Sequence, residues 1–245
     1  MTNRRRFIKN TSLGVVGLTF LSKKIFAEEE IKKITILHTN DMHSRIEPFK
    51  SGSYNGFGGM AQRSAIIKEI RERENNVLLF DAGDIFQGTP YFNFFGGEVE
   101  FKLMSEMKYD AAVLGNHDFD NGLIGLKKQL QHATFPFLIS NYDFNNTILK
   151  DQFKPYKIFT KQNIKIGVFG VGIELNGLVP KELYKETIYL DPIEQSKYYS
   201  NKLKNELGCD LVICLSHLGL QYKNEKISDI TLAKESKYID LIIGG

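Results

Sequence analysis

The sequence predicts an α/β protein built from layers of strands and helices. Short apolar runs rich in β-branched residues, such as Ile34–Leu37, recur along the chain and lead into clusters of Asp, His, Asn or Gly, which is typical of buried strands. Longer segments between them place apolar residues among charges at helical spacing, as in Met60–Arg73. Strands and helices that alternate in this way predict a layered α/β fold.

The individual elements follow one another from about residue 33 onward. In chain order we expect a strand at about 33–38, a helix at about 60–73, a strand at about 77–81, a helix at about 98–107, a strand at about 110–114, a helix at about 122–131, a strand at 135–139, a hairpin of 154–160 with 164–170, a helix at about 193–207, a strand at about 210–215, a helix at about 228–236 and a strand at about 239–243. Asn121-Gly122 opens the third helix, and Lys161–Asn163 supplies the turn of the hairpin. The hairpin makes part of a sheet antiparallel, and segments 140–153 and 173–192 are expected to be loops.

The composition is that of an ordinary globular protein. Its 245 residues suffice for one substantial core, with 42% hydrophobic and 25% charged residues. The formal charge of +3 depends on residues 1–27, which contain six of the 32 Lys and Arg and none of the 29 Asp and Glu. Without that segment 26 basic residues face 29 acidic ones, a net charge of about −3. We therefore expect no nucleic-acid partner, since such a partner requires a basic face.

Residues 1–27 have the pattern of an export signal. Arg4–Lys9 forms a basic start, Leu13–Leu21 an uncharged apolar centre, and Ala27 a small residue at the end, as in a cleaved signal peptide. The Arg-Arg-x-Phe-Ile-Lys core resembles a twin-arginine export signal of bacteria. The apolar centre is shorter than the roughly 20 residues of a membrane-spanning helix. We expect a periplasmic or secreted protein with no stable membrane insertion after cleavage; a Sec signal or an uncleaved anchor is the alternative.

Four of the expected strands end in side chains that bind metal ions. The set consists of Asp41, His43, Asp84, Asn116 and His217. Because sites in open α/β sheets gather at the carboxyl ends of strands, these side chains predict one convergent metal centre. Mixed nitrogen and oxygen donors suit Zn, Mn or Fe. Two such ions roughly 3.5–4 Å apart clamp a phosphoryl group and lower the pKa of a bridging water to about 7, which makes a hydroxide nucleophile.

His117 and Asp118 follow directly after one of these ligands. The ring of His117 is expected to face the substrate, and Asp118 is expected to hold its tautomer and favour its protonated form. A protonated His117 would stabilise the phosphoryl oxygens or protonate the leaving alkoxide. We therefore predict that His117 and Asp118 form the catalytic pair.

Each of these residues also has a purely structural explanation. Asp41 fits a turn, Asp84 fits a helix N-cap, and His217 fits a hydrogen-bonded core histidine. The placement of all of them at successive strand ends favours the metal centre.

The combined motifs resemble those of calcineurin-like metallophosphoesterases. The motifs are Asp41-x-His43, Gly83-Asp84, Gly115-Asn116-His117-Asp118 and His217. The stretches 37–43, 86–90 and 115–120 are similar to the 5'-nucleotidase branch of that family, and the similarity runs from about Ile34 to Gly245.

The resemblance implies a four-layer α/β/β/α sandwich over residues 33–245, with a dinuclear centre. It implies that Asp41 and His43 bind the first ion, that Asp84 bridges, and that Asn116 and His217 bind the second. It also implies an enzyme that hydrolyses nucleoside 5'-monophosphates or other small phosphate esters, with no organic cofactor.

Two departures from the family pattern leave alternatives open. The pattern continues after Gly244-Gly245 with His-x-His, which supplies one ligand to each ion, so we expect the chain to be an incomplete, C-terminally truncated domain. A C-terminal substrate-binding domain is also not included, which leaves base specificity open; a separate domain or chain is one source of it. The alternatives are a hydrolase of diester or sulfur-linked substrates on the same scaffold, and a catalytically inactive binding protein if the two ligands are truly absent.

Overall fold

The structure, a computed structural model, describes residues 31–245. This part of the chain is built on two principal β-sheets. The first sheet is parallel, with the order β1-β2-β3, formed by β1 (Thr35–Thr39), β2 (Val77–Asp81) and β3 (Ala111–Ala112). The second has the order β5-β6-β8-β9, formed by β5 (Tyr156–Lys161), β6 (Ile164–Val171), β8 (Leu211–Ser216) and β9 (Leu241–Gly244). Strand β5 is antiparallel to β6, as the hairpin predicted, and β6, β8 and β9 are parallel.

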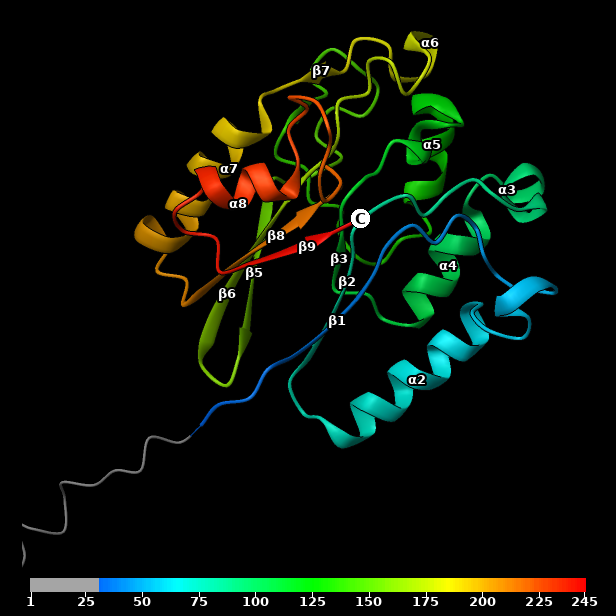
Figure 1. Ribbon diagram of the computed structural model, residues 1–245, viewed down its shortest axis with the longest axis horizontal. Helices are drawn as coiled ribbons and strands as arrows, with labels where there is room; N and C mark the ends of the chain where they lie inside the picture. Colours follow the sequence, from blue (N-terminus) through cyan, green and yellow to red (C-terminus); the bar gives the residue numbers. More distant parts are fainter. Residues whose placement is uncertain (1–30) are drawn as a thin grey trace, which may run out of the picture. The chain divides into compact units, whose positions relative to one another are not determined.

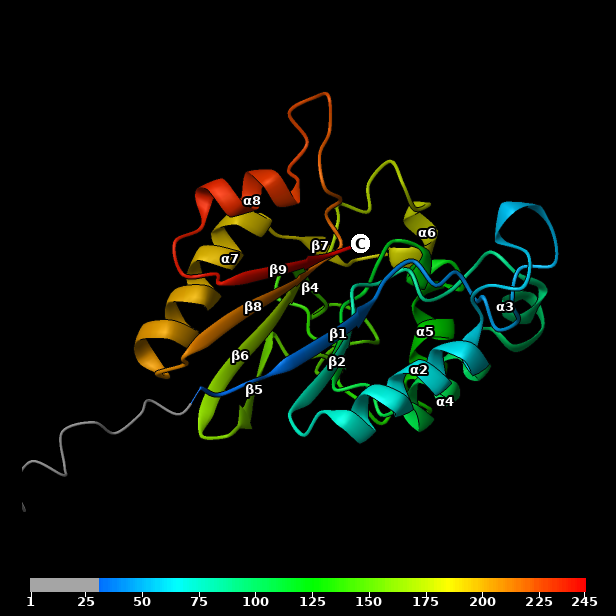
Figure 2. The ribbon, with the colours of Figure 1, turned by 60° about the horizontal axis from the view of Figure 1, so that its bottom comes forward.

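Helices cover the outer faces of both sheets. Figure 2 shows α7 and α8 over the second sheet, and α2 and α4 on the far side of the first sheet. The helices are α2 (Met60–Arg73), α3 (Pro90–Phe95), α4 (Glu98–Glu106), α5 (Gly122–Leu130), α6 (Lys181–Tyr184), α7 (Pro192–Asn201) and α8 (Asp229–Glu235), with single turns η2 (Gly52–Tyr54), η3 (His117–Phe119) and η4 (Lys202–Glu206). The N-terminus of α7 is capped by Asp191, whose side chain accepts the backbone N–H groups of Ile193 and Glu194.

The alternation of side chains along the second sheet explains why it has two buried faces. In β8, Ile213 and Leu215 join the core between the sheets, whereas Val212 and Cys214 join the cluster under α7 and α8. Because successive residues of a strand point to opposite faces, a run that is apolar throughout is buried on both. This fits a sheet placed between a second sheet and a layer of helices (Figure 1).

The inner faces of the two sheets pack directly against each other. The rings of Phe80 in β2 and Phe159 in β5 contact edge to face, with centroids 5.7 Å apart. Phe80 is fully buried. The order of layers is therefore helix, sheet, sheet, helix, which confirms the predicted α/β/β/α sandwich.

The prediction of a regular strand at 135–139 is wrong. Phe137 forms an isolated bridge with Ala112, and Leu138 forms one with Lys154. The segment changes partners within two residues, so neither pairing extends into a ladder. Its close approach to the second sheet requires a glycine, because a Cβ at Gly170 would lie 1.9 Å from the Leu138 carbonyl oxygen.

The two segments expected to be loops also contain short regular elements. Strands β4 (Tyr142–Asp143) and β7 (Ile188–Tyr189) pair antiparallel, and α6 precedes β7. Two-residue strands carry no detectable periodicity, which is why the sequence pattern did not reveal them.

The predicted signal peptide, residues 1–27, lies outside the described residues. Within residues 31–245, no helix combines the length and apolar character needed to cross a membrane. Ile34–Gly245 form one compact unit.

Candidate metal centre

The loops that follow β1 and β2 are joined by backbone hydrogen bonds beyond the ends of the strands. The N–H of Asp41 donates to the Gly83 carbonyl at 2.9 Å, and the N–H of His43 donates to the Asp84 carbonyl at 3.1 Å. The parallel pairing of β1 with β2 therefore continues into the two loops. It places Asp41 and His43 beside Asp84, as the strand-end argument predicted.

Three of the predicted ligands in these loops adopt left-handed backbone conformations. The φ angles are 48° at Asp41, 46° at His43 and 56° at Asp84. Non-glycine residues rarely adopt such angles, and they concentrate at functional sites.

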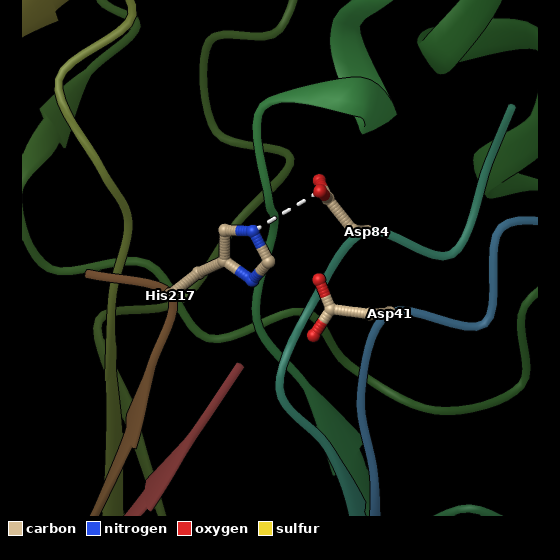
Figure 3. A group of neighbouring side chains, drawn as sticks. All are labelled: Asp41, Asp84 and His217. Atoms are coloured by element: carbon tan, nitrogen blue, oxygen red, sulfur yellow. Dashed lines mark ion pairs between the residues drawn. The ribbon is translucent and has the colours of Figure 1, made fainter. Parts of the chain in front are cut away.

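Asp41, Asp84 and His217 converge on one point. One ligand atom from each residue lies within 4.8 Å of the others, and Figure 3 shows the three side chains pointing toward one another from three different segments. The distance from Asp84 Oδ2 to His217 Nε2 is 3.2 Å. Asp84 is buried, and His217 follows directly after β8.

His43 lies near the same two carboxylates. Its Nε2 lies 3.9 Å from Asp41 Oδ1 and 3.9 Å from Asp84 Oδ2. The structure therefore brings together four of the five predicted ligands, with Asp84 next to both imidazoles.

Both imidazoles are anchored in the same way through Nδ1. The Nδ1 of His217 lies 2.7 Å from the Ala82 carbonyl oxygen, and the Nδ1 of His43 lies 3.3 Å from the Phe86 carbonyl oxygen. Because a carbonyl only accepts, Nδ1 carries the proton and Nε2 is left to face the carboxylates. A backbone carbonyl on the far nitrogen is the usual arrangement for a metal-binding histidine.

Asp84 and His217 stabilise each other's charged forms. Burial opposes the charged carboxylate of Asp84, but the hydrogen bond and charge of His217, with further contributions from His117, lower the pKa of Asp84. Burial likewise opposes a charged ring, but Asp84 raises the pKa of His217. The carboxylate and the imidazolium therefore form an ion pair, and a metal ion would bind Nε2 of His217 only after that nitrogen loses its proton.

The donor set fits a divalent ion of the Zn, Mn or Fe type. Two carboxylates and two imidazoles offer oxygen and nitrogen atoms to one space, and the imidazole nitrogens are already oriented.

Asn116 and His117 lie at the start of η3, directly beside Asp84. The N–H of His117 donates to Asp84 Oδ1 at 2.8 Å. The ring of His117 packs edge to face against His43, with centroids 5.2 Å apart. Asn116 is half-buried, and the peptide group that joins it to His117 contacts Asp84 through its N–H.

The prediction that Asp118 holds the ring of His117 is wrong. The carboxylate within hydrogen-bond distance of His117 Nδ1 is Asp120, with Oδ2 at 2.9 Å. Asp118 is fully buried, and its side chain accepts backbone N–H groups instead. In a 3-10 turn the side chains at i and i+3 eclipse, so His117 meets Asp120 while Asp118 points elsewhere.

The Asp120 carboxylate strongly affects the neighbouring ring. Burial opposes a charged His117, but the Asp120 hydrogen bond, together with the negative charges of Asp84, Asp120 and Asp118, raises the pKa of His117. The sequence signal for this pair is the three-residue spacing between His117 and Asp120. This spacing brings the two side chains together if the segment forms a 3-10 turn.

The comparisons with known proteins agree with this geometry. A family model described as calcineurin-like phosphoesterase matches residues 34–245. A snake venom 5'-nucleotidase from Crotalus adamanteus is 38% identical over 223 residues, which are 87% of this chain and 36% of that protein. A 5'-nucleotidase from Vibrio cholerae is 38% identical over 225 residues, 87% of this chain and 40% of that protein.

The solved structures include a similar fold at comparable identity. The 5'-nucleotidase precursor from Thermus thermophilus is 32% identical, with a TM-score of 0.78, and the match covers 86% of this chain and 41% of that one. The chain thus spans about two fifths of the length of these relatives.

Proposed function

The chain belongs to the calcineurin-like phosphoesterase family, and on that premise we propose that it is the catalytic part of a two-metal phosphomonoesterase that hydrolyses nucleoside 5'-monophosphates. The observation that carries this proposal is the convergence of Asp41, Asp84 and His217 within 4.8 Å.

The position of Asp84 supports the proposed ligand roles. Its Oδ2 lies 3.9 Å from Nε2 of His43 and 3.2 Å from Nε2 of His217. A carboxylate in that position suits a bridging ligand, with Asp41 and His43 on one ion and Asn116 and His217 on the other. When bound, two divalent ions neutralise phosphoryl charge and lower the pKa of a water molecule so that it becomes a nucleophile near neutral pH.

His117 and Asp120 supply the proton chemistry in this proposal. Asp120 accepts the Nδ1 proton of His117 at 2.9 Å, so Nε2 is the nitrogen available to the substrate. The carboxylate favours the protonated ring, which stabilises negative charge on the phosphoryl oxygens and gives a proton to the leaving alkoxide. Asp120 thereby takes the role that the sequence pattern suggested for Asp118.

The nucleotide substrate is inferred from the three relatives described above, all of which are named 5'-nucleotidases. The test is a panel of substrates with the full-length protein as its gene encodes it, in Mn²⁺ or Zn²⁺: AMP, a cyclic nucleotide, a phosphodiester and a thiosulfonate. The proposal expects kcat/KM for AMP to exceed that for the others. A preference for the diester or the thiosulfonate would replace the substrate class, and binding without turnover would indicate a binding protein.

We also propose export across the bacterial cytoplasmic membrane, supported by the Arg4–Lys9 sequence and the apolar stretch after it. A reporter fused to residues 1–30 is expected to stay in the cytoplasm of a strain that lacks the twin-arginine translocase. Export in that strain would contradict this route.

A further inference from the structure

The turn that carries Asp84 gives all of its consecutive backbone N–H groups to two buried carboxylates. The N–H of Gly83 donates to Asp81 Oδ1 at 2.9 Å. The next three N–H groups donate to Asp118: that of Asp84 to Oδ2 at 3.1 Å, that of Ile85 to Oδ1 at 3.0 Å and that of Phe86 to Oδ1 at 3.1 Å. Both aspartates are fully buried.

We propose that Asp118 is a positioning residue, which holds the Gly83–Phe86 turn in the conformation that presents Asp84 to the metal ions. This inference rests on the proposed function for its metal centre. Gly83 and Asp84 are both left-handed, with φ of 95° and 56°. Such a turn has no neighbouring strand whose carbonyl groups could accept its N–H groups. Buried N–H groups without an acceptor are strongly destabilising. Asp118 supplies the acceptor for three of them.

Asp118 also joins this turn to the neighbouring strand end. Its Oδ2 accepts the N–H of Gly115 at 2.8 Å as well as that of Asp84. One carboxylate therefore fixes the loop after β2 against the loop after β3. It sets Asp84 at a fixed place relative to Asn116 and His117.

The donors around Asp118 make a carboxylate irreplaceable there. Each oxygen receives two N–H groups: Ile85 and Phe86 at Oδ1, Asp84 and Gly115 at Oδ2. An asparagine has one oxygen and one NH₂ group, and NH₂ cannot accept. In either orientation of the amide, two backbone donors would face a donor.

Asp81 provides a matched control because its surroundings accept an amide. Its Oδ1 receives one N–H, from Gly83, and its Oδ2 receives the hydroxyl of Thr39 at 2.5 Å. The Thr39 hydroxyl also contacts the Tyr109 hydroxyl at 2.8 Å, and either of these two can donate. In Asp81→Asn the amide oxygen keeps the Gly83 bond and the NH₂ group donates to Thr39, which turns its own proton toward Tyr109.

The experiment compares Asp118→Asn with Asp81→Asn in the full-length protein, after metal removal, by calorimetric titration with Mn²⁺ alone. Asp118→Asn is expected to weaken Mn²⁺ binding by about 10- to 100-fold, the usual effect of losing a group that orients a ligand. Asp81→Asn is expected to bind as wild type does. Equal affinity in all three proteins, or equal weakening in both variants, would overturn the positioning role. A wild-type protein that binds no Mn²⁺ would instead refute the proposed function.

A second measurement needs no variant and covers the case in which Asp118→Asn does not fold. In the metal-free wild type, hydrogen exchange is expected to show the amides of residues 84–86 as protected as those of β2. Exchange as fast as in the exposed 52–58 loop would overturn the proposal.

Discussion

The carboxylate of Asp84 lies directly against the α-carbon of Gly115. A side-chain carbon at position 115 would stand 2.2 Å from Asp84 Oδ1 and 2.5 Å from the Asp84 nitrogen. Neither atom can move freely, because the Asp84 nitrogen belongs to the constrained turn and Oδ1 accepts the N–H of His117. The glycine of the Gly-Asn-His-Asp motif is therefore required by the position of the central carboxylate.

We predict that Gly115→Ala displaces Asp84 and lowers kcat/KM for the phosphate-ester substrate by about 100-fold, since a shift of roughly 1 Å in a site has that effect. The control is Gly208→Ala, where no atom lies within 4 Å of the added carbon. Gly208 precedes β8, at the end of that strand opposite His217. Its φ of 65° strains an alanine, so this variant also controls for a general loss of stability. If both variants keep wild-type turnover, the packing of Gly115 on Asp84 does not control the site.

A second prediction concerns the pair formed by His117 and Asp120. His117→Ala is expected to lower kcat by about 10²–10⁴-fold, the range for loss of a general acid. Asp120→Asn is expected to lower kcat in the same direction by less, with Mn²⁺ affinity unchanged. Because the two residues act as one unit, the double variant should be no slower than His117→Ala. Asp151→Asn, at an exposed aspartate, is the control. Additive losses in the double variant would show that the two side chains act separately.

The sequence predicted the ligand cluster because its members all follow the carboxyl ends of apolar strand runs. Asp41 and Asp84 follow neighbouring parallel strands, which places them at one edge of the first sheet. His217 follows β8 of the second sheet, so its approach also depends on how the two sheets pack, which the strand pattern does not specify. The partner of His117 could not be predicted in this way. Asp118 and Asp120 are close in sequence, and the 3-10 geometry of η3 decides which carboxylate meets the ring.

The same distinction between local pattern and tertiary contact explains the errors in the fold. Helix α2 was predicted to its exact bounds because its apolar residues recur at helical spacing over 14 residues. The 135–139 segment has the composition of a strand, but its neighbours in space allow only isolated bridges at Phe137 and Leu138. Strands β4 and β7 depend on each other across the chain and leave no periodic signal.

A third prediction tests the contact between the two sheets. Phe80→Ala removes a fully buried ring that packs on Phe159, and is expected to lower the free energy of unfolding by about 3–5 kcal/mol. Phe94→Ala, whose side chain is 81% exposed, should change it by about 0.5 kcal/mol or less. Urea unfolding of the two variants provides the comparison. Equal small effects would mean that the sheets do not share a core at Phe80.

A fourth prediction concerns pH and a carboxyl group away from the metal centre. Burial raises the pKa of Asp110 above its usual 3.8, although its carboxylate accepts the N–H of Leu79. The folded state therefore holds this proton more tightly than the unfolded state. The stabilisation is complete below pH 3.8 and is lost as pH rises through the raised pKa.

Asp110→Asn does not titrate and can still accept the Leu79 N–H. The stability of this variant relative to wild type is expected to increase with pH from about pH 4 upward and then level off. Urea unfolding of both proteins at a series of pH values measures the difference. A difference that is constant or that falls with pH would contradict the assigned direction.

The most direct test of the central claim is AMP hydrolysis by the full-length protein before and after metal removal, with the bound metal counted. We predict that the chelated protein is inactive, that Mn²⁺ or Zn²⁺ restores turnover with two ions bound, and that Asp84→Ala is inactive in every condition. Undiminished AMP hydrolysis by the metal-free protein, or full activity of Asp84→Ala, would contradict the account.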